Sequence, residues 1–285
     1  MRRARPLLGT IVEISVSGAP SPMTNRAVAA AFATIERVQA RMSYHDATSE
    51  LSQLNRWAVR RPTRVSRPVA TVLRAALSLA RATDGAFDPT IAPVLAGWGL
   101  LPRLPTRTGT ERAATWRDVE VSPTDFVSFR TSLHLDLGGI AKGFAVDRAI
   151  DSLRNAGIRS ALVNAGGDLR AFGPRAWPIL VRDPSHPGAP AAKLSLRNAA
   201  LATSAHYFSR RPWRGRLVSA LVDGRVRRPQ GEDGRSVTVQ APRAMMADAL
   251  TKVVFALGVE AKGILNRHSA RAFVLGDDRA VEIGG

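Results

Sequence analysis

The chain has 285 residues, enough for one large domain or two small ones, and it contains no cysteine, which excludes disulfides, thiolate metal sites and a cysteine nucleophile. Lysine and arginine outnumber the acidic residues by 41 to 23, giving a net charge of +18. No nucleic-acid motif and no arginine stripe with interleaved aromatic residues accompanies this charge, so we expect a solvated basic surface and no nucleic-acid partner. No run of 18 apolar residues occurs, and we expect no transmembrane helix.

The first predicted elements are a strand and two helices. Apolar and polar residues alternate over residues 12–16, which predicts a half-buried strand and argues against the signal peptide that a basic, then apolar start superficially resembles. Residues 24–43 carry apolar side chains at helical spacing, with Thr24 as the expected N-cap. A short helix is expected next, capped by Ser49 or Thr48.

A longer amphipathic helix and a loop follow. The helix is expected over residues 68–82, ended by Asp84 and Gly85. Because proline interrupts helices, the proline-rich segment 87–105 is predicted to be a loop. The Pro/Gly/Arg-rich segment 101–112 is the candidate hinge between two subdomains.

The second half of the chain reads as mixed structure. From residue 133 a strand, a helix over 140–155 and a strand over 160–166 form a β-α-β unit that ends in a Gly-Gly turn. A later helix over 245–258 is closed by Gly258. The pattern indicates the α+β class, with mixed sheets flanked by helices in a single unit of residues 1–285. The remaining segments are expected to be short strands and a closing hairpin, namely 178–183, 193–204, 216–223, 236–242 and 272–284, the last turning at Gly276-Asp277-Asp278.

The stretch "LHLDLGGIAKGFAVDRAIDSL" joins a strand-like run to a helix-like run. Glycines permit close approach to the backbone, a helix start offers N–H donors, and Lys142 adds a positive charge, so the junction suits a phosphate or diphosphate. Asp136 would then need a donor on the ligand or a cation. The alternative is a tight turn with a surface lysine, and the stretch alone does not decide between the two.

A second group of residues lies in "TDGAFDPTIAPVLAGWG". Pro89 fixes the loop and pushes Asp88 into an extended conformation. A rigid loop with an aromatic ring and an acid suits a planar polar ring as ligand. The alternative is that Phe87 and Trp98 pack into the core, as aromatic residues commonly do.

A third group lies in "MMADALTKVV", near the C-terminus. On a helix Asp248 and Thr251 share a face, and their oxygens are ligands of the type that Mg²⁺ accepts. Lys252 lies four residues after Asp248, so a simple Asp–Lys pair on the helix surface is the alternative, and this segment alone favours it.

Taken together and in order, these motifs resemble the FAD:protein FMN transferase family, the ApbE-like flavin transferases. The resemblance extends over nearly the whole chain, and matches in register are more specific than any single motif. The segments that carry it are "LLGT", "MSYHDATSEL", "TDGAFDPTIAPVLAGWG", "LDLGGIAKGFAVDRA", "LVNAGGDLRAFG", "ATSAHY" and "ADALTKVVFALG".

The resemblance implies an ApbE-like, T-fold-like α+β unit with two subdomains, and a reaction. FAD is bound with Mg²⁺, its diphosphate is cleaved, FMN is joined through a phosphoester to a Thr or Ser of an acceptor flavoprotein, and AMP leaves. The metal is expected at the backbone carbonyl of Gly139 and the side chains of Asp248 and Thr251. FAD is expected against Leu8, Tyr44, Ala86, Phe87, Asp88, Asp136, Lys142 and Val222.

The chain departs from the family pattern at two places. In "ALVDGRVRRP" Asp223 is kept, but Ala220 stands where the family has the histidine that is its candidate general base, and His206 is a substitute worth testing. Lys252 stands where the family's metal helix tends to carry a threonine, and it either weakens Mg²⁺ binding or lends its own charge to the phosphate. His206, Asp223 and Lys252 are therefore the candidate catalytic residues.

These departures leave two alternatives to FMN transfer open, an FAD pyrophosphatase that gives FMN and AMP, and a non-catalytic FAD-binding protein. The chain begins almost at the first family motif and shows no anchor, which favours a cytoplasmic location in a bacterium. The family resemblance points instead to export and attachment to a membrane. The acceptor protein and the oligomeric state are not indicated by the sequence.

Overall fold

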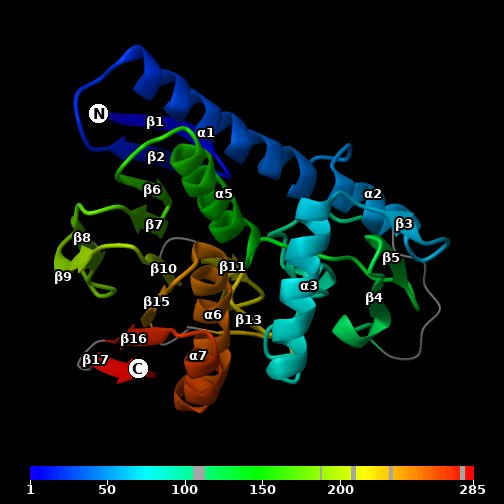
Figure 1. Cartoon of the computed structure of the whole chain (residues 1–285). Coiled ribbons are helices and arrows are strands. Elements are labelled where there is room, and N and C mark those ends of the chain that lie inside the picture. Colours follow the sequence, from blue (N-terminus) through cyan, green and yellow to red (C-terminus); the bar gives the residue numbers. More distant parts are fainter. Residues whose placement is uncertain (105–112, 187, 207–209, 231–233, 277–279) are drawn as a thin grey trace.

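An antiparallel sheet of eight strands organises the fold (Figure 1). The computed structural model describes residues 1–104, 113–186, 188–206, 210–230, 234–276 and 280–285. The strands follow one another across the sheet in the order β1 (Arg2–Leu7), β2 (Thr10–Val16), β6 (Ala161–Ala165), β7 (Asp168–Phe172), β10 (Ala200–Ala205), β15 (Ser236–Ala241), β16 (Arg271–Leu275) and β17 (Ala280–Ile283).

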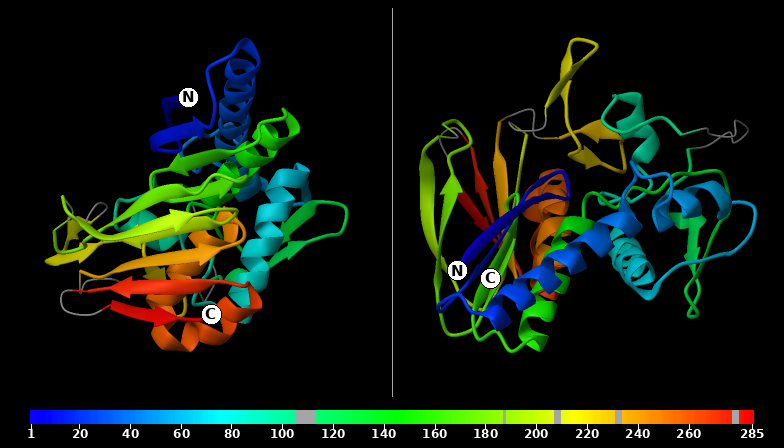
Figure 2. Two further views of the ribbon diagram at one scale, coloured as in Figure 1. Left: turned by 60° about the vertical axis from the view of Figure 1, so that its left-hand side comes forward. Right: turned by 90° about the horizontal axis from the view of Figure 1, so that it is seen from above.

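Helices cover one face of this sheet and a hairpin covers part of the other (Figure 2). The helix layer and the sheet share the large hydrophobic core, whereas the hairpin packs Trp177, Ile179 and Leu196 in a separate small cluster against Leu169 and Leu201 of the sheet. The helices are α1 (Pro22–Met42), α5 (Ala141–Asn155), α6 (Ala244–Leu257), η2 (Gly258–Ala261) and α7 (Lys262–Arg267), and the hairpin is β8 (Trp177–Arg182) and β9 (Pro190–Leu196).

A second group of elements lies beyond the helix layer, on the side away from the sheet (Figure 2). Most of its buried residues belong to the same core as those of the sheet and helices, whereas Leu95, Trp98, Val218 and Val222 form a separate small cluster. It consists of α2 (Glu50–Trp57), β3 (Thr63–Arg64), α3 (Arg67–Ala82), α4 (Ala92–Gly97), η1 (Trp116–Asp118), β4 (Val119–Val121) and β5 (Phe126–Phe129), with the small hairpins β11 (Arg211–Trp213) and β12 (Arg216–Val218), and β13 (Val222–Asp223) and β14 (Arg228–Pro229).

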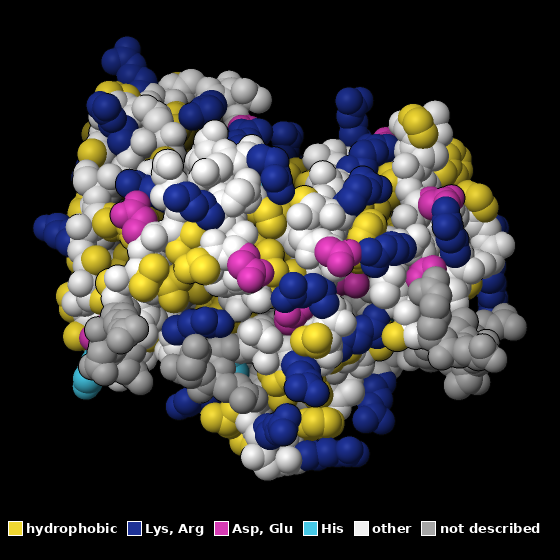
Figure 3. All heavy atoms as spheres, turned by 90° about the horizontal axis from the view of Figure 1, so that it is seen from below, with side chains coloured by type: hydrophobic (Ala, Val, Ile, Leu, Met, Phe, Trp, Pro, Cys, Tyr) yellow, Lys and Arg dark blue, Asp and Glu magenta, His cyan; other side chains and the backbone are white. Residues whose placement is uncertain are grey.

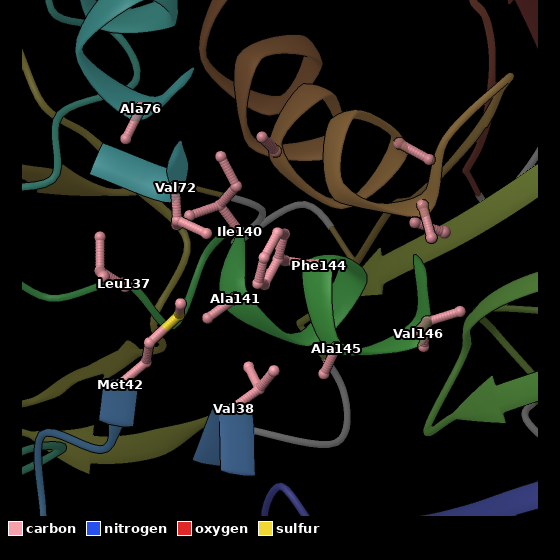
Figure 4. Packing of buried hydrophobic residues seen from close by; sticks show 14 of the residues in the cluster. Val38, Met42, Val72, Ala76, Leu137, Ile140, Ala141, Phe144, Ala145 and Val146 are labelled. Carbon is pink, nitrogen blue, oxygen red and sulfur yellow. The ribbon is translucent and has the colours of Figure 1, made fainter. Parts of the chain in front are cut away.

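The start of α5 lies in the large hydrophobic core. Ile140 lies beside Val72 of α3, and Ala141 and Ala145 face Met42 and Val38 of α1 (Figure 4). A Cβ added to Gly143 would lie 2.2 Å from the carbonyl oxygen of Ala244, the first residue of α6. Gly143 is therefore a contact between two helices, and only glycine permits this approach.

The helices α5 and α6 cap each other. Asp147 of α5 accepts hydrogen bonds from the N–H groups of Ala244 (3.1 Å) and Met245 (3.0 Å) at the start of α6. Asp248 of α6 accepts one from the N–H of Gly143 at the start of α5 (3.1 Å). A carboxylate at a helix N-terminus satisfies an otherwise unpaired donor and interacts favourably with the helix dipole, so each helix stabilises the start of the other.

Several predicted elements are confirmed. These are the strand at 12–16, the helix that Ser49 caps, the helix closed by Gly258 and the closing hairpin of β16 and β17. Residues 277–279 of the predicted hairpin turn lie outside the described residues, as do residues 105–112 of the predicted hinge at 101–112. The division into subdomains therefore stays a prediction.

Two predictions near the N-terminal half are wrong. Helix α1 begins earlier than expected, because the Oγ atom of Ser21 accepts the N–H of Thr24 (3.1 Å) and makes Ser21 the N-cap in place of Thr24. Within the segment predicted to be a loop, Ala92–Gly97 form the helix α4, since Pro93 falls at the start of the helix, where its missing N–H is tolerated.

The predicted strand at 133–137 is also wrong, and with it the β-α-β unit. The N–H of Leu135 donates to Asn55 Oδ1 (2.8 Å) and that of Asp136 to the carbonyl of Pro89 (2.8 Å). The segment is thus extended but binds a helix side chain and a loop, and it joins no sheet. This arrangement holds it against the loop that follows α3.

Candidate active site

A cavity of about 1500 Å³ lies between the sheet, the loop after α3 and the starts of α5 and β13. Its size exceeds the usual range for pockets that bind small ligands, so it has room for a dinucleotide. Most of the predicted site residues line it, although they come from segments far apart in the chain. Those that line it are Leu8, Tyr44, Phe87, Asp88, Asp136, Gly139, Lys142, Val222 and Lys252.

The loop after α3 forms one wall of the cavity. Asp84 and Gly85 both have positive φ values (47° and 85°), which end the helix and turn the chain. The carbonyl of Ala86 accepts the N–H of Gly224 (3.0 Å), so Ala86 is buried behind the wall and does not line the cavity. Phe87 is buried and also lines the cavity. Its ring therefore packs in the core and is at the same time available for contact with a ligand.

Asp88 fixes the end of this loop. Its Oδ1 accepts hydrogen bonds from the N–H and the hydroxyl of Thr90, both at 2.8 Å. Burial raises the pKa of the Asp88 carboxyl, while the bonds from Thr90 act in the opposite direction. The local geometry of the wall is therefore set by the loop itself and needs no ligand.

Tyr44 presents a buried polar atom to the cavity. Its side chain is 4% exposed, and its hydroxyl has no hydrogen-bond partner among the described residues. Burial, and then the carboxylate of Asp136, raise the pKa of Tyr44 to about 12, so the hydroxyl stays protonated at neutral pH. A buried donor without a partner costs free energy, and a ligand acceptor in the cavity would satisfy it.

The backbone of the glycine turn offers fewer free donors than the sequence suggested. The N–H of Gly138 donates to Asp136 Oδ1 (3.1 Å), those of Ile140 and Ala141 to the carbonyl of Leu137, and that of Gly143 to Asp248. These groups cannot also form the predicted phosphate cradle. With four of its N–H groups already bonded, most of the positive charge at the turn must come from side chains.

Lys142 supplies part of that charge. Its side chain is 35% exposed, but its ammonium group donates to the carboxylate of Asp168, which is 2% exposed, so it is held in an ion pair and is not the free surface lysine of the alternative interpretation. Burial alone would lower the pKa of Lys142, but the carboxylates of Asp168 and Asp248 raise it above its ordinary value. The group therefore stays charged. Asp168 was not predicted as a site residue, although its position directly after the Gly-Gly turn is a signal that could have identified it.

Asp248, Thr251 and Lys252 lie together, next to the glycine turn. The Nζ atom of Lys252 donates to the carbonyl of Asp248 (3.0 Å) and to its Oδ1 atom, and the Asp248 side chain is fully buried. Thr251 Oγ1 donates to the same carbonyl and lies 2.7 Å from Ser204 Oγ. Burial alone would raise the pKa of Asp248, but the ammonium groups of Lys252 and Lys142 hold it below its usual value.

The pair interpretation of Asp248 and Lys252 is confirmed in part, because the ion pair exists but is buried and borders the cavity. A Cβ added to Gly139 would lie 3.8 Å from Lys252 Cε and 3.5 Å from the Phe87 ring. The structure thus brings the late helix, the glycine turn and the loop after α3 to one point. Asp248 and Thr251 are fully buried behind Lys252 and do not line the cavity.

Two candidate catalytic residues lie outside the cavity wall. Asp223 is buried and accepts hydrogen bonds from the guanidinium of Arg225 (3.0 and 2.7 Å). His206 is 3% exposed and is not among the residues that line the cavity. Ala220, which stands in place of the family histidine, does line it. Catalytic roles for His206 and Asp223 stay predictions.

One face of the molecule shows how the basic side chains are distributed. On the face shown in Figure 3, lysine and arginine side chains are scattered among hydrophobic and acidic ones and form no continuous stripe. Within the described part of the chain, no helix combines the length and the apolar character needed to cross a membrane.

Comparison with known proteins places these features in one family. The model of the ApbE family matches residues 8–274. The chain is 30% identical over 270 residues to the FAD:protein FMN transferase of Haemophilus influenzae, covering 88% of this chain and 73% of that protein. It is 28% identical over 285 residues to the protein of the same name from Treponema pallidum, covering 90% and 79%.

Solved structures give the same result for the fold. An ApbE protein from Thermotoga maritima superimposes with a TM-score of 0.84 at 27% identity, over 100% of this chain and 96% of that one. A mutant of the flavin transferase ApbE from Vibrio cholerae gives a TM-score of 0.81 at 26% identity, over 99% and 96%. With a family match that spans almost its whole length, the chain is a member of the ApbE family.

Proposed function

We propose that this chain is an FAD:protein FMN transferase that moves FMN from FAD to a serine or threonine hydroxyl of an acceptor protein. Family membership and the names of the relatives support the activity, and their organisms support a bacterial setting. The observation that carries the proposal is the convergence of the loop after α3, the glycine turn and α6 on a cavity large enough for FAD.

In this proposal the chain binds and orients FAD and neutralises its diphosphate. Phe87 and Tyr44 hold the flavin end of the cavity by ring contact and a hydrogen bond, and Lys142 and Lys252 face the phosphates. The acceptor hydroxyl supplies the nucleophile, so the chain needs none of its own. Phosphoryl transfer depends mainly on positioning and charge stabilisation, which such residues provide.

Magnesium was predicted at Gly139, Asp248 and Thr251, but the residues present do not fit it. Both carboxylate oxygens of Asp248 already have partners, Lys252 and the N–H of Gly143. Mg²⁺ requires several oxygen ligands at about 2.0–2.1 Å in octahedral geometry. A divalent ion about 4 Å from the Lys252 ammonium would meet a repulsion of about 8 kcal/mol at an effective dielectric constant of about 20.

The activity is tested by incubating the full chain with FAD and an acceptor domain that carries a candidate serine or threonine. We expect flavin fluorescence that stays with the acceptor band after denaturation, together with AMP in the supernatant. The acceptor with that residue changed to alanine is the matched control.

Release of FMN and AMP without labelling would identify an FAD pyrophosphatase, which the exposed Ala220 on the cavity wall allows. Binding without any product would identify a non-catalytic FAD-binding protein.

The variant Tyr44→Phe tests the predicted ligand contact. We expect it to weaken FAD binding by about 2- to 10-fold, because a hydrogen bond contributes about 0.5–1.5 kcal/mol. The free energy of unfolding should stay the same or rise, since the hydroxyl has no described protein partner to lose. Calorimetric titration and urea unfolding measure the two quantities. An unchanged dissociation constant for FAD would remove Tyr44 from the binding site.

A further inference from the structure

We propose that the ammonium group of Lys252 takes the place of a divalent cation, so that this enzyme neutralises the FAD diphosphate and transfers FMN without metal. The inference rests on the proposed function and concerns the same cavity. It follows from where the ammonium group is held, from which of its donors are free, and from the shortage of other positive groups at the glycine turn.

The side chain of Lys252 is held in place by Asp248, one turn earlier on the same helix, α6. The side chain is 15% exposed and its ammonium group is held by the carbonyl and the carboxylate of Asp248, which is fully buried. The rest of the side chain lies against Gly139, beside Phe87, at the cavity wall. A carboxylate that would otherwise attract a metal ion is thus occupied by a tethered cation.

One donor of Lys252 remains for a ligand. An ammonium group has three N–H donors. Two of them bind the carbonyl and Oδ1 of Asp248. The third has no acceptor among the described residues, and Lys252 borders the cavity, so this donor is available to a ligand there. Lys142 is arranged in the same way on the buried Asp168. Two lysines, each anchored by a buried aspartate, therefore border the same space.

Most backbone donors at the turn are already used. The N–H groups of Gly138, Ile140, Ala141 and Gly143 have protein acceptors, so they cannot stabilise a diphosphate. The third nearby carboxylate, Asp136, would repel the diphosphate and makes a cationic counterpart more necessary. The cavity is also lined by Arg2, Arg175 and Arg182, but at the glycine turn itself the two ammonium groups are the cations that can supply the charge a metal would otherwise bring.

The step that Lys252 serves increases the negative charge. The acceptor oxygen bonds to the flavin-side phosphorus, and the bond from that phosphorus to the bridging oxygen breaks. AMP leaves with the bridging oxygen, and the hydroxyl proton is released. A diphosphate with two negative charges becomes a phosphodiester with one and an AMP with two, so a fixed cation stabilises the products and the transition state before them.

The test compares FMN transfer by the full chain in EDTA and in excess Mg²⁺. We expect the two rates to agree within about twofold. Lys252→Met should lower the rate by about 10²-fold or more in either condition, the size expected when one charge-stabilising donor is lost. Lys262→Met, at an exposed lysine on α7, is the matched control and should leave the rate unchanged. Lys252→Thr should gain activity in Mg²⁺ but not in EDTA.

Binding of Mn²⁺ to the FAD-free protein gives a readout that does not depend on turnover. Electron paramagnetic resonance should show only free Mn²⁺ with the wild-type chain and one bound ion with Lys252→Thr. Wild-type transfer that vanishes in EDTA and returns with Mg²⁺ would overturn the role of Lys252 while leaving the proposed function intact. If no transfer occurs in either condition, the proposed function fails, and Mn²⁺ bound by the wild-type chain but not by Asp248→Asn would still overturn the role of Lys252.

Discussion

Gly143→Ala should destabilise the chain by about 3 kcal/mol or more, a loss that urea unfolding followed by tryptophan fluorescence would measure. The added Cβ would lie 2.2 Å from the carbonyl oxygen of Ala244 and 2.8 Å from the Cα of Met245. Both are backbone atoms, so the helices α5 and α6 must move apart, and the hydrogen bond from Gly143 to Asp248 must lengthen. The gain in helix propensity from alanine, about 1 kcal/mol, is too small to compensate.

Gly263→Ala is the matched control. Gly263 also lies in a helix, α7, but no atom lies within 4 Å of the Cβ that alanine would add. We expect this variant to be as stable as the wild type or more stable, by up to about 1 kcal/mol. If both variants unfold at the same urea concentration as the wild type, the close approach of α5 to α6 does not require glycine at position 143.

Asp147→Ala should cost about 3–5 kcal/mol of unfolding free energy, the range expected when one partner of a buried ion pair is removed. Asp147 receives two N–H groups from the start of α6 and the guanidinium of Arg170 (2.8 Å), and both side chains of this ion pair are less than 10% exposed. Without it, a buried charge and two helix donors lose their acceptor. Thermal and urea unfolding provide the measurement.

Asp151→Ala, one helical turn further along α5, is the comparison. Asp151 pairs with Arg148 (3.2 Å) and Arg243 (3.5 Å), whose side chains are about half exposed, and lies only at 4.0 Å from the buried Arg170. Exposed pairs contribute about 0–1 kcal/mol, and salt weakens them. We therefore expect a small effect that declines in high salt. An equal loss of stability in the two variants would contradict the special role given to Asp147.

Local patterns in the sequence predicted the regular helices well. Apolar residues at helical spacing identified α1, α3 and α6, and Gly258 marked the end of α6. The edge strand β1 was missed, because its side chains are nearly all exposed and show no alternation. The helix α4 was missed because its proline was taken to indicate a loop, although proline fits the first turn of a helix.

The segment 133–137 shows why the sequence misled. Leu133, Leu135 and Leu137 alternate with polar residues at the period of two that is typical of a strand, although His134 between them is buried as well. Periodicity reports burial on one side, but it does not report which groups accept the backbone hydrogen bonds. Here the acceptors are Asn55 and Pro89, distant in the chain, and no sequence pattern names them.

The site residues were found by resemblance, and their arrangement required the structure. Motif matches identified Tyr44, Phe87 and Lys142, which do line one cavity. The same matches also included Ala86, which lies behind the wall. The residue spacing allows Lys252 to pair with Asp248 but does not show that it does. The structure shows this pair, which depends on how the side chains pack on α6.

The mutual capping of α5 and α6 ties the chemistry to the global stability of the protein. The carboxylate that holds Lys252 is the same one that receives the N–H of Gly143, 105 positions earlier in the chain. Fraying at the start of α5 would remove one of the donors that orient this carboxylate, while the pair of Asp248 and Lys252 lies within α6. Because a carboxylate of each helix holds the start of the other, we expect amide protons at the two helix starts to exchange with solvent as one cooperative unit.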